Sequence, residues 1–162
     1  MPDFGEMLPG KTLILGVGNP ICGDDGAGPR VIEMLAEKDL PPHVTIEDAG
    51  TPGWGLPVWL DGFSSIILVD TMDMDLEPGG WRRFLPEEVR IIAQNQVVSL
   101  HHTDLANGLA LSQALEILPD QILFYGIQPA NTSPGTPMSS PVSSRLPEVV
   151  ESILKDIGND LP

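Results

Sequence analysis

A glycine-rich, acidic segment, residues 16–28, constrains the fold of this 162-residue chain more than any other feature. It follows an apolar run at residues 12–15 and precedes apolar residues that recur with helical spacing over 29–38. A short apolar run bounded by a turn is typical of a buried strand, and the helical spacing is typical of an amphipathic helix. The segment therefore predicts a strand, a tight loop and a helix, which is a building unit of α/β folds.

The loop carries acids where nucleotide-binding loops carry other residues. Gly18 and Gly23 have the spacing of P-loop glycines, but Asp24 stands where that motif needs lysine, so phosphates would meet negative charge. The dinucleotide fingerprint fails too, because counting from Gly16 and Gly18 its third glycine would fall on Ile21. A loop that offers carboxylates between a strand and a helix instead indicates a bound cation.

The rest of the chain alternates between strand and helix periods, which predicts an α/β sandwich with a mainly parallel sheet. We expect strands at 12–17, 44–49, 65–70, 80–85 and 121–127, and helices at 29–38, 56–60, 86–93, 104–118 and 147–157. The strand at 65–70 is nearly all apolar and should be central, buried on both faces. A single domain, 1–162, would then carry an N-terminal extension at 1–11 and a surface loop rich in Pro and Ser at 129–141.

Composition excludes several classes of partner. The net charge of −15 disfavours nucleic acids and anionic membrane surfaces. No apolar run approaches the roughly 20 residues that a membrane-spanning helix needs. The single cysteine, Cys22, has no partner for an internal disulfide, which fits a reducing compartment. We therefore expect a cytoplasmic protein, acting as a monomer, with no nucleic-acid or membrane partner.

Three candidate functional residues converge on one edge of the predicted sheet. Asp25 lies in the loop after the first strand, and Asp70 ends the central strand. Ligands of open parallel sheets bind beyond the carboxyl ends of the strands, so both acids should face the same crevice. His101 begins the long helix and belongs to a loop that could return there. Two carboxylates and one imidazole suit a borderline divalent ion with coordination positions left open.

These residues belong to a set of motifs that resembles the hydrogenase maturation endopeptidases. The matching segments are 18–19, 23–29, 69–70, 101 with 105, and 126–129, and together they span nearly all of residues 12–129. The resemblance implies a single-domain, three-layer α/β sandwich with a twisted, mostly parallel sheet flanked by helices. It also places the family's metal-contacting acid, aspartate and histidine on Asp25, Asp70 and His101.

The resemblance further implies an activity. Members of this family remove the C-terminal extension from the large-subunit precursor of nickel-iron hydrogenases after nickel insertion. Nickel would arrive within that precursor and be recognised by Asp25, Asp70 and His101, so no tightly bound metal is expected in the resting enzyme. By the same resemblance, these three residues would carry the catalytic role, and no Ser/His/Asp or Cys/His arrangement is evident in the sequence.

Several alternatives remain open at the level of sequence. His102 follows His101 directly, and His101 is preferred because Leu105 stands four residues after it, as in the family motif. Asp24 is expected to cap the following helix, and the acids at 73 and 75 are expected in a solvated loop. A metal-dependent phosphohydrolase and a noncatalytic chaperone of a nickel site are the rival functions.

Overall fold

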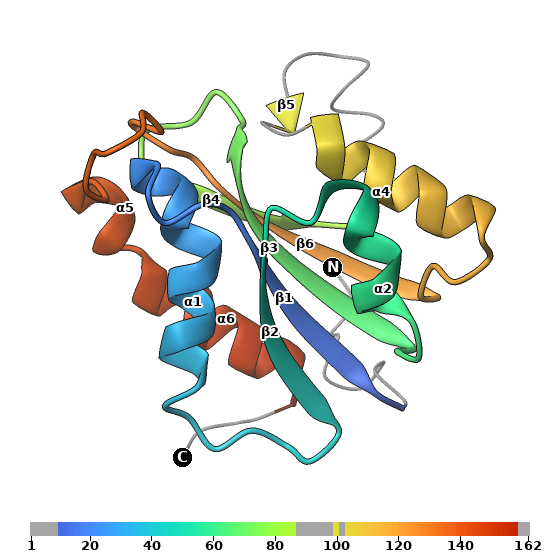
Figure 1. The fold of residues 1–162 in the computed structure, drawn as a ribbon. Coiled ribbons are helices and arrows are strands. Elements are labelled where there is room, and N and C mark those ends of the chain that lie inside the picture. The colour runs from blue at the N-terminus through green and yellow to red at the C-terminus, as the bar shows by residue number, and fades with distance from the viewer. Residues whose placement is uncertain (1–9, 87–98, 101–102, 159–162) are drawn as a thin grey trace.

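The computed structural model describes residues 10–86, 99–100 and 103–158, which form an α/β fold with helices on both faces of a sheet (Figure 1). In chain order the elements are β1 (Thr12–Val17), η2 (Gly23–Gly26), α1 (Ala27–Leu35), β2 (Val44–Gly50), η3 (Gly53–Gly55), α2 (Leu56–Leu60), β3 (Ser65–Asp73), β4 (Trp81–Phe84), β5 (Ser99–Leu100), α4 (Thr103–Ala114), β6 (Gln121–Ile127), α5 (Ser140–Ser143) and α6 (Leu146–Asp156).

The sheet has the order β2-β1-β3-β6-β4, with β5 paired to the end of β3. The pairs β1–β2, β1–β3 and β3–β6 are parallel, whereas β4 runs antiparallel to β6 and β5 runs antiparallel to β3. The expected mostly parallel sheet is thus confirmed. Since β1, β2, β3 and β6 run in the same direction, the loops that leave their carboxyl ends gather at one edge.

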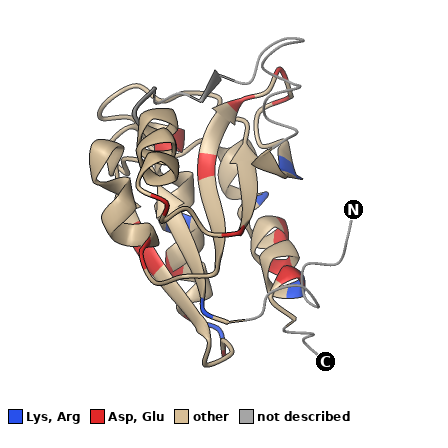
Figure 2. Ribbon diagram, turned by 90° about the vertical axis from the view of Figure 1, so that its right-hand side faces the viewer, with Lys and Arg blue, Asp and Glu red and all other residues tan. Residues whose placement is uncertain are grey.

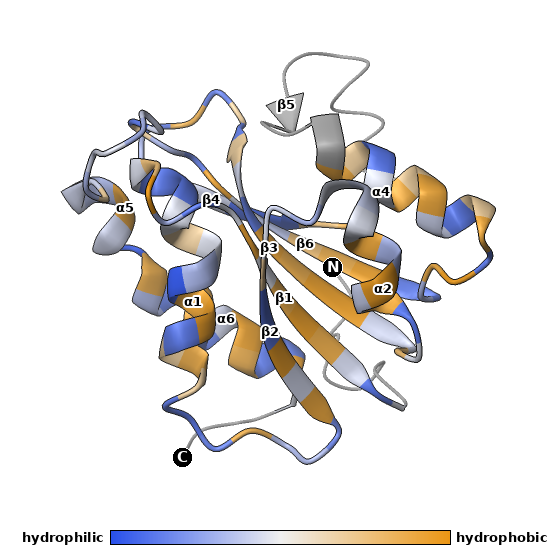
Figure 3. Cartoon of the chain, in the orientation of Figure 1, coloured by the Kyte–Doolittle hydropathy of each residue, from blue (hydrophilic) through white to orange (hydrophobic). Residues whose placement is uncertain are grey.

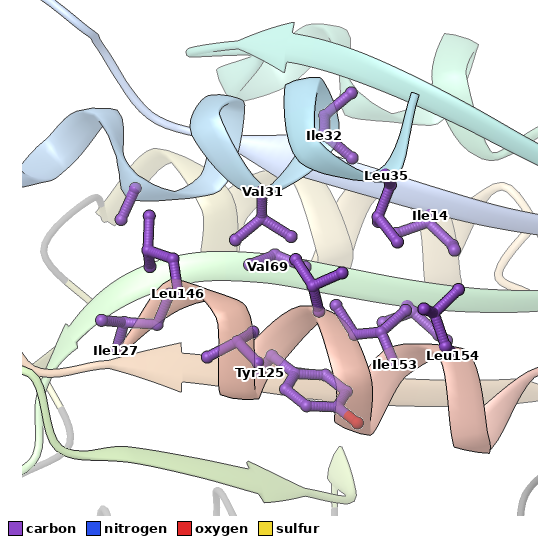
Figure 4. Close-up of a cluster of buried hydrophobic side chains, with 14 of the residues drawn as sticks. Ile14, Val31, Ile32, Leu35, Val69, Tyr125, Ile127, Leu146, Ile153 and Leu154 are labelled. Atoms are coloured by element: carbon purple, nitrogen blue, oxygen red, sulfur yellow. The ribbon is translucent and has the colours of Figure 1, made fainter. Parts of the chain in front are cut away.

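The central strand β3 is buried on both faces, as its apolar sequence predicts. Ile67 and Val69 belong to a core cluster between the sheet and helices α1 and α6 (Figure 4). Ile66 and Leu68 belong to a second cluster beneath α2 and α4. Side chains alternate across a strand, so successive residues of β3 hold the two helical layers in place. The apolar colour of the central strands in Figure 3 follows from this double burial.

Element boundaries differ from the sequence prediction at two places that matter for the site. The helix expected at 104–118 ends at Ala114, because Glu116 adopts a left-handed conformation with φ 58° that an α-helix does not continue through. The central strand expected at 65–70 continues to Asp73. The helix expected at 86–93 and the extension at 1–11 lie almost entirely outside the described residues.

Charge is distributed over the fold rather than gathered on one element, and Asp and Glu residues colour several helices, strands and loops (Figure 2). Among the helices that the structure describes, none combines the length and the apolar character needed to cross a membrane.

Candidate active site at the carboxyl edge of the sheet

The loop after β1 turns back over the end of its own strand, and two glycines permit that turn. Gly18 has a φ of 142°, and a Cβ atom there would lie 1.8 Å from the carbonyl oxygen of Asp25. A Cβ atom on Gly28 would lie 2.3 Å from the carbonyl oxygen of Val17. Only glycine accepts such close backbone approach. The glycines therefore bring Asp25 back to the carboxyl end of the sheet.

Asp25 is held in place by hydrogen bonds on both carboxylate oxygens. Asp25 lies in the η2 turn, and only 4% of the residue is exposed to solvent. Oδ2 accepts a hydrogen bond of 2.9 Å from the backbone N–H of Asn19, and Oδ1 accepts one of 3.1 Å from the hydroxyl of Thr71. Thr71 directly follows Asp70, so this contact links the loop after β1 to the central strand.

Asp70 is the second carboxylate of the edge and is 1% exposed. Its Oδ1 accepts a hydrogen bond of 2.8 Å from the backbone N–H of Thr71, whereas Oδ2 is buried and has no hydrogen-bond partner among the described residues. Burial, and secondarily the negative charge of Asp25, raises the pKa of Asp70 well above its ordinary value, and the bond from Thr71 opposes that rise. A buried, unpartnered oxygen beside a second carboxylate is an arrangement that a cation or a proton stabilises.

The candidate histidines, His101 and His102, lie outside the described residues. The elements on either side of them in the sequence are placed. In β5, Leu100 pairs with Met72 of β3, and α4 begins at Thr103. Within the part of the chain that the structure describes, no group of three or more His, Cys, Asp or Glu side chains is arranged to hold a metal. The described edge thus brings the Asp25 and Asp70 carboxylates together, and the metal-binding role of these two residues and of a histidine remains a prediction.

The helix α4 lies close to the loop after β2 because its contact residue is a glycine. A Cβ atom on Gly108 would lie 2.4 Å from the carbonyl oxygen of Gly53 and 2.7 Å from the Cβ of Leu56. Leu105, one turn earlier on α4, is buried in the cluster beneath α2. This packing fixes the start of α4 against the same face of the sheet that carries the even-numbered residues of β3.

Asp24 does not cap a helix, which corrects the sequence prediction. Neither η2 nor α1 has a side-chain cap. The Asp24 carboxylate instead accepts hydrogen bonds from the backbone N–H groups of Ala130, Asn131 and Ser139 and from the Ser139 hydroxyl. The predicted surface loop at 129–141 is therefore fastened to the loop after β1.

Gln128 is a site-adjacent residue to which the sequence analysis gave no role. Its Oε1 accepts a hydrogen bond of 2.6 Å from the N–H of Met74 and one of 3.3 Å from the N–H of Leu76, and its Nε2 donates to Asp73. The residue is only 8% exposed. Residues 73–75 were expected in a solvated loop, but Asp73 ends β3 and Met74 is buried, so that expectation holds only for Asp75. The signal that could have found Gln128 was the 126–129 motif itself.

Comparison with known proteins identifies the class to which this fold and edge belong. A solution structure of an endopeptidase from Escherichia coli matches with a TM-score of 0.80 at 27% identity, covering 91% of each chain. The [NiFe] hydrogenase maturation protease HybD from Thermococcus kodakarensis matches with a TM-score of 0.74 at 29% identity, covering 90% of this chain and 97% of that one. Both matches are to peptide-bond hydrolases of the same α/β architecture.

Sequence comparison narrows the class to one family. The family model for HycI, described as hydrogenase maturation protease, matches residues 29–156. The hydrogenase expression/formation protein HupD of Bradyrhizobium diazoefficiens is 30% identical over 138 residues, which are 84% of this chain and 72% of that protein. The chain therefore belongs to the hydrogenase maturation protease family, and it is an endopeptidase.

Proposed function

We propose that this endopeptidase removes the C-terminal extension of a nickel-iron hydrogenase large-subunit precursor after nickel has been inserted, and that it recognises the nickel held by the substrate. Membership of the family supports the processing of a hydrogenase large subunit. The observation that carries the nickel-recognition step is the pair of buried carboxylates, Asp25 and Asp70, at the carboxyl edge of the sheet.

The electrostatics of this pair explain why a cation would be recognised there. Asp25 raises the pKa of Asp70, so the two negative charges oppose each other across a buried edge. A divalent ion brought by the precursor would favour the ionised form of both and offset their repulsion. The unpartnered Oδ2 of Asp70 is the oxygen available for that contact among the described residues.

We propose His101 as the third ligand, with His102 as the alternative. Two carboxylates and an imidazole leave coordination positions open for the precursor's own ligands, so the resting enzyme should contain little tightly bound metal. A divalent ion in such a site can polarise a carbonyl or activate water. Hydrogen bonds within this chain hold the two carboxylates in the positions from which they would contact the ion. Thr71 and Asn19 hold the Asp25 carboxylate, and the Thr71 N–H holds one oxygen of Asp70.

The partner in this proposal is the precursor protein alone. The net charge of −15 supports the absence of nucleic acids and anionic membranes as partners. The single cysteine supports a reducing, cytoplasmic setting. We propose that the enzyme acts there as a monomer.

The test is the intact mass of a nickel-loaded cognate precursor after incubation with the enzyme. Wild type is expected to release a C-terminal peptide, whereas Asp25→Asn and Asp70→Asn are expected to leave the precursor whole. Asp61→Asn makes the same substitution at an exposed aspartate, and this variant should process the precursor as wild type does. Stoichiometric nickel binding without a change in precursor mass would instead support a chaperone. Phosphate release from phosphoesters, lost in Asp70→Asn, would support a phosphohydrolase.

A further inference from the structure

Asp24 connects three parts of the molecule that meet beside the candidate site. Its carboxylate accepts from Ala130, Asn131 and Ser139, at donor–acceptor distances of 2.7–3.0 Å. Its backbone N–H donates to the Asn131 carbonyl at 2.9 Å, and its carbonyl accepts from the N–H of Ala27 at the start of α1. Figure 1 shows the segment that leads into α5 beside the start of α1. One residue thus ties the 130–139 loop, the η2 turn and the first turn of α1 together.

The Asp24 carboxylate is buried as well as hydrogen-bonded on both of its oxygens. Asp24 is 0% exposed, and a fully buried carboxylate is tolerated only where hydrogen bonds replace its hydration. The approach is also close on the backbone side, since Gly23 has a φ of 57° and a Cβ atom there would lie 2.5 Å from the Asn131 carbonyl oxygen. The loop and the turn therefore pack closely against each other through backbone atoms as well as through the Asp24 side chain.

The residue that follows Asp24 is the candidate ligand Asp25. The two lie in a single turn of 3-10 helix, Gly23–Gly26, whose own hydrogen bonding is short-range. Within that turn, the N–H of Asp25 donates to the carbonyl of Cys22 at 3.1 Å. Successive side chains of a 3-10 helix point about 120° apart, so while Asp24 is held by the loop, the Asp25 carboxylate points in another direction, to the Asn19 N–H and the Thr71 hydroxyl.

We infer that Asp24 is a positioning residue of the active site: by fastening the 130–139 loop to the η2 turn, it sets the orientation of the Asp25 carboxylate toward Asp70. This inference rests on the proposed function, because that proposal assigns Asp25 to the site. Asp24 itself does not contact the metal or the scissile bond. Its carboxylate is occupied by the loop.

The substitution that tests the inference is Asp24→Asn, which keeps the shape of the side chain. The amide keeps one oxygen, which can accept either from Ser139 in the place of Oδ1 or from Ala130 and Asn131 in the place of Oδ2, and its NH2 group then faces the N–H donors of the other position, so those bonds are lost. Amide hydrogen exchange followed by NMR reports the result without any substrate. Exchange at Asn19 is the informative signal, because that N–H is bonded to the Asp25 carboxylate.

A matched control lies in another buried carboxylate. Asp156 is 1% exposed and accepts hydrogen bonds from Arg83, at 2.5 Å, and from the Tyr125 hydroxyl. Burial, and then the bond to Asp156, raises the pKa of Tyr125, so its hydroxyl keeps the proton that it donates. Asp156→Asn therefore disturbs a buried network beneath α6 and leaves the η2 turn intact.

We expect Asp24→Asn to accelerate exchange at Asn19, and at Ala130 and Asn131 or at Ser139, by roughly tenfold or more relative to Asp156→Asn. With a precursor that wild type processes, kcat should fall roughly 100-fold while KM changes less, because a displacement of about 1 Å in a catalytic group costs that much. Asp156→Asn should keep the wild-type kcat at a temperature where both variants are folded.

Two results would overturn the inference. Faster exchange confined to the loop, with Asn19 unchanged, would show that Asp24 only holds the loop. Equal loss of kcat in Asp24→Asn and Asp156→Asn would show general destabilisation. A wild type that processes no precursor would refute the proposed function, and exchange at Asn19 would still decide whether Asp24 orients Asp25. If Asp24→Asn does not fold, Ser139→Ala removes one hydroxyl bond and should shift the same amides in the same direction, and an unchanged Asn19 would count against the inference.

Discussion

Neutralising Asp70 should stabilise the protein while abolishing its activity. Burial, and then the charge of Asp25, raises the pKa of Asp70, and its Oδ2 is buried without a hydrogen-bond partner among the described residues. Each unit by which folding raises this pKa costs about 1.4 kcal/mol of stability once the carboxyl group is ionised, and an amide in its place avoids that cost. The variant Asp70→Asn keeps the shape of the side chain and removes its charge. We expect its free energy of unfolding to exceed that of wild type at pH 7 by about that amount for each such unit.

The same physical cause gives a pH dependence with a definite sign. An acid whose pKa is raised by folding binds its proton more tightly in the folded state. The contribution of Asp70 to the free energy of unfolding should therefore be most favourable below pH 3.8, the ordinary pKa of an aspartate. It should be lost as the pH rises through the raised pKa of Asp70 in the folded state. Asp70→Asn should lack this pH dependence.

Thermal and denaturant unfolding of the metal-free protein between pH 4 and pH 8 checks both statements. At this chain length, a gain of 1 kcal/mol corresponds to about 2–4 °C in Tm. Asp61→Asn is the matched control, because Asp61 is exposed. This substitution should leave the change in the free energy of unfolding between pH 4 and pH 8 as it is in wild type. An Asp70→Asn variant that is less stable than wild type at pH 7, or that keeps the wild-type pH slope, would refute the electrostatic argument.

Three further predictions concern the surroundings of the site. Gly18→Ala should fail to yield active enzyme, since its Cβ would meet the Asp25 carbonyl oxygen at 1.8 Å, and a wild-type processing rate would contradict the loop geometry. Gln128→Ala should lower the free energy of unfolding by about 1–3 kcal/mol in urea titrations, because the Met74 N–H loses its buried acceptor; no change would mean that water replaces the amide. His101→Ala should leave the precursor unprocessed in a mass assay while His102→Ala retains processing, and equal loss in both would overturn the ligand assignment.

The central features of the fold were accessible from sequence because they depend on local pattern. A nearly continuous apolar run predicts a strand buried on both faces, and β3 is such a strand. The short helix at 56–60 was predicted with the bounds that the structure has, because Pro57 is compatible with a first helical turn. The positions of Asp25 and Asp70 at one edge follow from the direction of parallel strands, which the pattern also predicts.

The roles of Asp24 and Gln128 were not accessible in this way. The partners of the Asp24 carboxylate lie 106–115 residues further along the chain, whereas helix capping, the role predicted for it, is a local interaction. Gln128 likewise bonds to residues 52–55 positions earlier, and those bonds hold the segment that follows β3. Hydrogen bonds between distant loops leave no periodic trace, so only the folded structure reveals them.

The measurement that tests the central claim most directly compares two samples of one cognate precursor, nickel-loaded and nickel-free, each incubated with the wild-type enzyme and followed by intact mass. The proposed recognition of substrate nickel by Asp25 and Asp70 predicts release of the C-terminal peptide from the loaded sample alone. Release from both samples at the same rate would contradict nickel recognition, and release from neither would contradict the proposed processing reaction.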